Sequence, residues 1–83
     1  MAQPTRTQSQ LGAFIRRTRK TASLTQSQLA ELINKRQATI SNLESAGAGA
    51  NLDTLFAVLS ALDLELILRP RSKANIEELR DIF

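Results

Sequence analysis

This sequence lacks cysteine and histidine altogether, and it has no long apolar run. Without cysteine there is no disulfide and no thiolate chemistry, and without histidine the usual general base and the commonest metal ligand are missing. The apolar runs fall short of the roughly 20 residues that span a bilayer, and residues 1–10 lack the apolar core of a signal peptide. We therefore expect a soluble intracellular protein that is not an enzyme and needs no cofactor or metal.

Size and charge distribution point to partners. A chain of 83 residues forms one small domain with a modest core, so the monomer should be marginally stable and should gain stability from a partner subunit. Residues 1–43 carry seven basic side chains and one acidic one, whereas residues 44–83 carry four basic and seven acidic ones. This division suggests different partners for the two halves, with ordinary solvated surface as the alternative.

The first half of the chain predicts two helices that begin with the same capping pattern. The pattern T-x-x-Q occurs at residues 7–10 and again at residues 25–28, each time before apolar residues at helical spacing. The first helix should run to about residue 20, the second should last about two turns, and residues 1–6 should form a disordered arm. The cations near the end of the first helix, which either are solvated or contact phosphates, are Arg16, Arg17, Arg19 and Lys20.

A sharp turn and two more helices should follow. Asn34 tolerates a left-handed backbone, so it can end the second helix abruptly. The third helix is predicted from about Gln37 to Glu44, and a flexible loop separates it from a fourth helix that Asn51 or Asp53 can cap. The expected buried stripe of the fourth helix consists of Leu52, Leu55, Phe56, Leu59 and Leu62.

The pattern changes from helical to alternating at residues 64–70, LELILRP, which indicates a strand that ends at Pro70. A lone strand leaves its backbone N–H and C=O groups unpaired. We therefore expect it to pair antiparallel with the same strand of a second copy, with the two-fold axis at Ile67. The side chains expected in this dimer contact are Leu64, Leu66, Ile67 and Leu68.

Residues 71–83 are interpreted as a separate tail that contains a short helix. Its acidic side chains should be repelled by phosphate groups, whereas Leu79 and Phe83 fall on one apolar stripe. Such a segment can fold on a protein partner with these two side chains as anchors, or it can dock on its own domain.

The second and third helices are joined so tightly that they must cross steeply, as in a helix-turn-helix. Ile40 and Leu43 should face the core, while the opposite face carries short side chains, namely Gln37, Ala38, Ser41 and Asn42. Glutamine can bond to adenine through two hydrogen bonds, arginine can bond to guanine, and an alanine methyl can contact the thymine methyl. The helix N-termini also offer N–H groups to phosphates. This face therefore suits a DNA groove.

The stretch TQSQLAELINKRQATISNLE at residues 25–44 resembles the helix-turn-helix of lambda-repressor-like, Xre-type regulators. Together with the fourth helix and LELILRP it is most similar to HipB-type antitoxins, over about residues 8–70. Asn34 stands where that family usually has glycine, and Lys35 where it usually has an apolar residue. The resemblance implies a mainly α domain over residues 7–70, with four to five helices and one C-terminal strand in an intermolecular two-stranded sheet.

The same resemblance implies a homodimer that binds an inverted-repeat operator in double-stranded DNA and represses its own operon. It also implies that a HipA-type kinase toxin is held inactive, in the bacterial cytoplasm at the nucleoid. From the apolar stripe of the tail we expect Leu79 and Phe83 to bind this toxin. The resemblance puts Arg36, Gln37, Ala38 and Ser41 at base edges. It puts Gln26, Thr39 and Asn42 near phosphates. From their positive charge, and not from the resemblance, we also expect Lys35 and Arg17 at the DNA backbone. Two alternatives stay open: a protein-interaction module of helix-turn-helix fold, and a stand-alone Xre-type repressor without a toxin partner.

Overall fold

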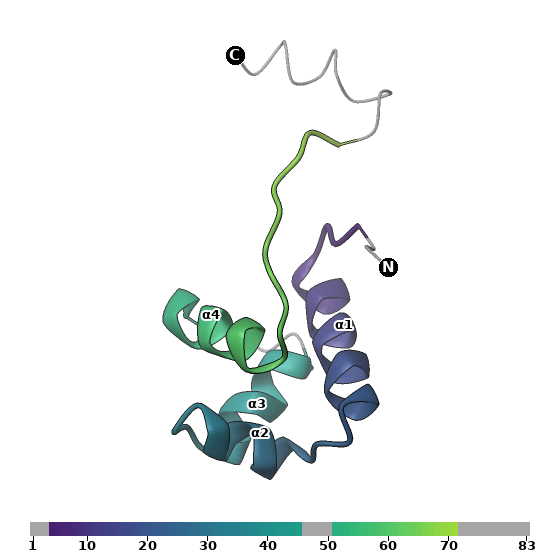
Figure 1. The fold of residues 1–83 in the computed structure, drawn as a ribbon. Helices are drawn as coiled ribbons and strands as arrows, with labels where there is room; N and C mark the ends of the chain where they lie inside the picture. Colours follow the sequence, from purple (N-terminus) through teal and green to yellow (C-terminus); the bar gives the residue numbers. More distant parts are fainter. Residues whose placement is uncertain (1–3, 46–50, 72–83) are drawn as a thin grey trace.

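Four helices form the folded part of the chain in the computed structural model, which describes residues 4–45 and 51–71. They are α1 (Gln8–Thr21), α2 (Gln26–Leu32), α3 (Gln37–Glu44) and α4 (Leu52–Ala61). In Figure 1, α2 and α3 cross below α1 and α4, and the segment after α4 runs past α1 and away from the helices. This confirms the predicted mainly helical, helix-turn-helix fold, while the fifth helix lies outside the described residues. No helix of the described part could cross a membrane.

The capping residues explain where α1 and α2 begin. Thr25 and Gln28 form a complete capping box, in which each side chain accepts a hydrogen bond from the other residue's backbone N–H, at 2.8 and 3.0 Å. Thr7 caps α1 in the same way by accepting from the N–H of Gln10 at 3.0 Å. The side chain of Gln10, however, accepts from the N–H of Arg6 at 2.6 Å. At α1 the side chain of Gln10 therefore bonds to the N–H of Arg6, and not to the N–H of Thr7 as the predicted capping box requires.

The turn between α2 and α3 depends on one left-handed residue. Asn34 has a φ of 57°, which confirms the expected role of this residue. With Asn34 in that conformation, the N–H of Lys35 donates to the carbonyl of Ala30 at 2.9 Å and closes the end of α2. Ser23 and Asp63 follow α1 and α4 with φ of 60° and 58°. Polar residues thus end three helices where glycine is commonest.

The core lies where α1, α2, α3 and α4 meet. Ala30 of α2 is 2% exposed, so this small side chain is part of the core. Burial of each larger core side chain stabilises the fold by about 1.5–3 kcal/mol. The cluster consists of Ile15, Leu29, Ala30, Ile40, Leu43, Val58 and Leu62.

Gly12 allows α1 to lie directly on the C-terminal end of α3. A Cβ atom at this position would meet the carbonyl oxygens of Glu44 and Leu43 at 2.5 and 2.7 Å, which is closer than real Cβ contacts come. Any larger residue must therefore push the two helices apart. The spacing of α1 from α3 is fixed by this residue.

The buried face of α4 differs from the predicted stripe. Leu52 and Phe56 are 68% and 52% exposed, whereas Thr54 and Val58 are buried. The helix carries apolar residues on two sides, and the side that faces the core is the one with Val58 and Leu62. Periodicity alone does not choose between two such stripes, and this is why the prediction was wrong for Leu52 and Phe56.

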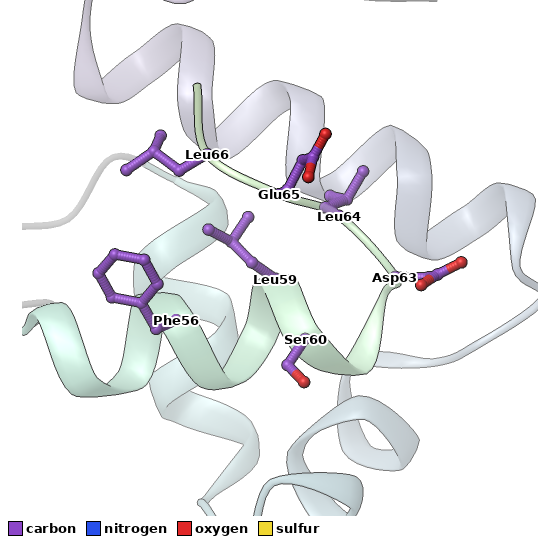
Figure 2. Close-up of a pocket in the computed structure, with 7 residues that line it drawn as sticks. All are labelled: Phe56, Leu59, Ser60, Asp63, Leu64, Glu65 and Leu66. Atoms are coloured by element: carbon purple, nitrogen blue, oxygen red, sulfur yellow. The ribbon is translucent and has the colours of Figure 1, made fainter. Parts of the chain in front are cut away.

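Residues 64–71 leave the domain in an extended path without helix or strand. Leu64 packs against the core, whereas Leu66, Ile67 and Leu68 are 48%, 68% and 87% exposed. Phe56, Leu59 and Leu66 line a hollow of about 360 Å³ (Figure 2). We call the exposed side chains of Leu52, Phe56, Leu66, Ile67 and Leu68 the apolar face. The predicted pairing of this segment needs a second copy, so a single chain does not test it.

Candidate nucleic-acid interface

The helix α3 presents two opposite faces. Ile40 and Leu43 are buried and attach α3 to the core, as expected from the sequence. The outward face, which we call the recognition face, consists of Arg36, Gln37, Ala38, Ser41 and Asn42. All of them are exposed except Ser41, which is half-buried. Short polar side chains on a helix that projects from the domain can enter the major groove of DNA.

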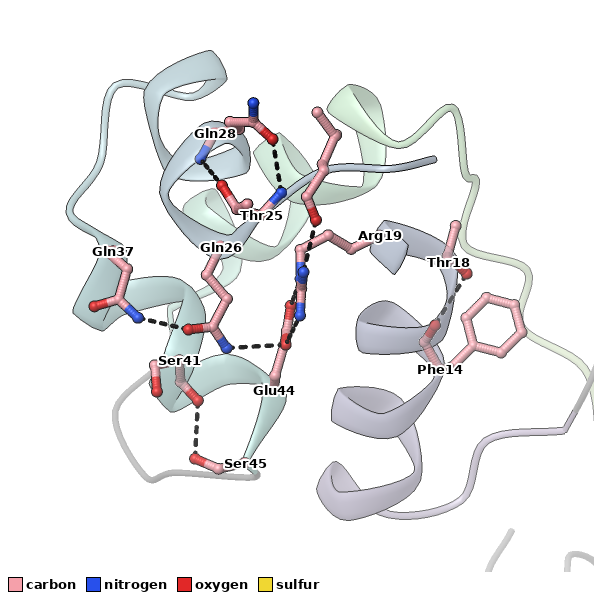
Figure 3. A network of polar contacts seen from close by, with 11 residues as sticks. Phe14, Thr18, Arg19, Thr25, Gln26, Gln28, Gln37, Ser41, Glu44 and Ser45 are labelled. Atoms are coloured by element: carbon pink, nitrogen blue, oxygen red, sulfur yellow. Dashed lines mark hydrogen bonds and ion pairs between the residues drawn. The ribbon is translucent and has the colours of Figure 1, made fainter. Parts of the chain in front are cut away.

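A buried ion pair joins α1 to the C-terminal end of α3. Arg19 donates from Nε to Glu44 Oε2 at 2.6 Å and from Nη2 to Glu44 Oε1 at 3.0 Å (Figure 3). Its Nη1 donates to the carbonyl of Leu24 at 2.7 Å. The side chains of Arg19 and Glu44 are only 8% and 3% exposed. A pair this deeply buried is costly to break, because either partner alone would be an uncompensated charge.

Arg19 was predicted to be part of a surface cluster of cations, and that expectation is wrong. It lies one helical turn after Ile15, which itself follows Leu11 by one turn, so Arg19 continues the inner stripe of α1. That spacing was visible in the sequence. The hydrogen bonds to Glu44 raise the pKa of Arg19 above its ordinary value, so the guanidinium stays charged.

Two glutamines extend this network to the recognition face. Gln26, at the start of α2, donates from Nε2 to Glu44 Oε1 at 3.1 Å. Gln37, at the start of α3, donates from Nε2 to Gln26 Oε1 at 2.5 Å. Both were predicted at the DNA interface, but the sequence pattern gave no sign that they bond to each other. Figure 3 shows the Oε1 atom of Gln37 turned away from Gln26.

The other cations of the α1 cluster lie beside α3. Arg16, Arg17 and Lys20 line a hollow of about 610 Å³ together with Ser45, which follows α3. Arg17 also lies over the ring of Phe14, 5.7 Å from its centroid. The hollow is open and basic apart from the buried, paired Glu44, so it can accept phosphate groups.

The other residues that were predicted to contact the DNA backbone lie on α3 or just before it. Lys35 and Asn42 are exposed, and Thr39 is half-buried. Leu79 and Phe83 lie outside the described residues. Within residues 4–45 and 51–71, no group of three or more carboxylate, histidine or cysteine side chains could hold a metal ion.

Comparison with known proteins finds relatives that share the helix-turn-helix fold described above. A family profile described as helix-turn-helix matches residues 15–68. The chain is 36% identical over 69 residues to antitoxin HipB of Escherichia coli O6:H1. The aligned residues cover 83% of this chain and 73% of that protein. A HipB variant in complex with an O2 20mer superposes with a TM-score of 0.80 at 32% identity, over 87% of this chain and all of that one. A HipA–HipB–O2–O3 complex gives 0.79 at 34% identity, over 86% of this chain and all of the other.

Proposed function

We propose, because this chain belongs to the HipB-type antitoxins of the helix-turn-helix family, that it binds operator DNA as a homodimer and represses its own operon. The observation that carries the proposal is the recognition face, where polar side chains project from α3 and Gln37 is held by Gln26. Arg36, Gln37, Ala38 and Ser41 read base edges. Gln26, Lys35, Thr39, Asn42 and Arg17 contact the DNA backbone.

The dimer forms through the segment after α4. The apolar face is uncovered in the single chain, and Ile67 and Leu68 are among its most exposed members. Antiparallel pairing of residues 64–70 about Ile67 would place Glu65 opposite Arg69 on both sides of the axis. The two recognition helices would then lie about one DNA turn apart, roughly 34 Å. The operator is accordingly an inverted repeat.

The second partner is a HipA-type kinase toxin, which the dimer holds inactive. Support comes from the family and from the HipA–HipB–O2–O3 structure that this chain resembles. The tail, with Leu79 and Phe83 as anchors, is the segment that binds the toxin. Such a protein acts by binding rather than by catalysis, and a DNA-bound repressor works in the cytoplasm at the nucleoid.

Duplex binding as a function of salt tests the DNA-binding part. The logarithm of affinity for the native promoter should fall steeply with the logarithm of salt concentration, because released counterions accompany each phosphate contact. A scrambled duplex of the same length is the control, and it should bind more weakly at every salt concentration. Weak, salt-independent binding to both duplexes would favour the protein-interaction module instead.

Deletion of residues 74–83 tests the antitoxin part. Operator affinity should stay within a few fold, while capture of the co-encoded kinase should be lost, because the acidic tail serves the protein partner. A second variant keeps the full tail but changes Leu79 and Phe83 to Ser. It distinguishes a contact made by these two side chains from a requirement for the length of the tail. Full kinase binding by the truncated chain would refute the role of the tail, and the absence of any kinase partner would leave a stand-alone repressor.

A further inference from the structure

One chain of hydrogen bonds connects a buried charge to the surface that faces DNA. It begins at the guanidinium of Arg19 and passes through the carboxylate of Glu44 and the amide of Gln26. It ends at the amide of Gln37 on the recognition face. Glu44 itself is 8% exposed and lies at the far end of α3 from Gln37, so it does not reach a base.

The direction of every hydrogen bond in this chain follows from the charge of Glu44. A carboxylate only accepts hydrogen bonds, so the Gln26 atom that faces it must be the NH₂ group. The carbonyl oxygen of Gln26 is then the atom left for Gln37, which must in turn present its own NH₂ group. The carbonyl oxygen of Gln37 is therefore the atom turned outward, as Figure 3 shows.

An outward carbonyl favours one purine over the other. Adenine offers the N6 amino group as a donor and N7 as an acceptor, which match the Oε1 of Gln37 and its second Nε2 proton. Guanine offers two acceptors, O6 and N7, so its O6 would meet the carbonyl oxygen of Gln37. A glutamine that is free to rotate could turn its NH₂ group toward guanine and escape this repulsion. A glutamine whose NH₂ group is held by Gln26 cannot do so without breaking that hydrogen bond.

We propose that Glu44, acting through Gln26, is a positioning residue that makes Gln37 select adenine against guanine. The proposal rests on the proposed DNA-binding function and extends it to a residue that does not touch DNA. Arg19 contributes by holding the carboxylate in place with two hydrogen bonds. Base selection and the packing of α1 on α3 are thereby linked through the same ion pair.

The test compares affinities for four duplexes that carry each base pair at the position that Gln37 reads. That position is identified as the one where Gln37→Ala removes the base preference. Gln26→Met keeps the length of the side chain and leaves the ion pair intact, but it has no donor for Glu44 and only a weakly accepting sulfur for Gln37. The ratio of adenine to guanine affinity should fall by about three- to tenfold in this variant. Any loss of a phosphate contact would lower all four affinities together and would cancel in the ratio.

Glu44→Gln and Gln8→Met complete the set of variants. Glu44→Gln should lower the same ratio, since the amide can turn an NH₂ group toward Gln26 and reverse the chain. Gln8→Met, the same chemical change at the start of α1, should leave the ratio unchanged. An unchanged ratio in folded Gln26→Met protein would overturn the proposal.

A measurement without DNA separates this proposal from the proposed function. The side-chain amide of Gln37 should give ordered NMR signals in the native protein and mobile ones in Gln26→Met. An amide signal of Gln37 that does not change in Gln26→Met, in a protein that binds its operator selectively, would refute the positioning role alone. A native protein with an ordered Gln37 that bound operator and scrambled duplexes equally well would refute sequence-specific DNA binding, and the selectivity with it.

Discussion

The recognition face on α3 and the apolar face on α4 and residues 66–68 are both exposed, but they are held in different ways. Gln37 on the recognition face is tied through Gln26 and Glu44 to the interior. On the apolar face, Ile67 and Leu68 lie in a segment with no helix or strand. One surface is therefore organised within a single chain, whereas the other should become ordered only against a second chain.

The largest effect is expected where the apolar face is disrupted. Ile67→Pro removes a backbone donor at the proposed two-fold axis, so the dimer should dissociate. Operator affinity should fall by about 10²–10⁴, because the two half-sites would no longer be bound by linked subunits. Sedimentation and duplex titration measure both effects. Ile67→Val, which keeps the donor, is the control, and an intact Ile67→Pro dimer with native affinity would contradict the proposed pairing.

A smaller effect, on stability, is expected from the ion pair behind the recognition face. Glu44→Ala leaves the Arg19 guanidinium buried without its carboxylate and should lower the free energy of unfolding by about 3–5 kcal/mol. The double variant Arg19→Met with Glu44→Leu should recover much of this loss, because no charge is then left unpaired. Thermal or urea unfolding measures the difference. Equal stability of the single and double variants would show that packing, not charge, dominates at this position.

Much of the fold was predictable because local signals agree with the tertiary structure. The Thr25–Gln28 capping box, the left-handed Asn34 and the buried Ile40 and Leu43 all follow from residue type and spacing. These features involve residues close together in the chain, where conformational preference decides the outcome. The helix-turn-helix could therefore be derived before its three-dimensional structure was known.

The features that the sequence did not predict depend on contacts between residues far apart in the chain. Arg19 and Glu44 are 25 residues apart, and Gln26 and Gln37 are 11 apart, so no local pattern pairs them. The prediction of the buried side of α4 failed for a related reason. This helix has two apolar stripes, and only the shape of the core selects the one that is buried. The recognition face was predictable as a set of residues, but its internal hydrogen bonds were not.

Base recognition by Gln37 is expected to show a more moderate effect. Gln37→Ala would remove the two hydrogen bonds that we propose Gln37 makes to a base, and it should cost about 1–3 kcal/mol at one base pair, with a relaxed preference there. A panel of operators with single base-pair changes measures it. Gln8→Ala, the same change at the exposed start of α1, provides a control that should leave base preference unchanged. Equal losses on operator and random duplexes would instead make Gln37 a backbone contact.

The smallest effect is expected from the basic hollow beside α3, where Arg17 lies over Phe14. A single phosphate contact adds about one unit to the salt dependence of binding. Arg17→Gln should therefore reduce the slope of log affinity against log salt by about one, with the same loss on specific and random duplexes. Arg71→Gln makes the same change of charge in the segment after α4, where the DNA should not reach, and it should leave the slope unchanged. If both variants reduced the slope equally, overall net charge rather than a contact in the hollow would be responsible, and the placement of DNA along α1 would be wrong.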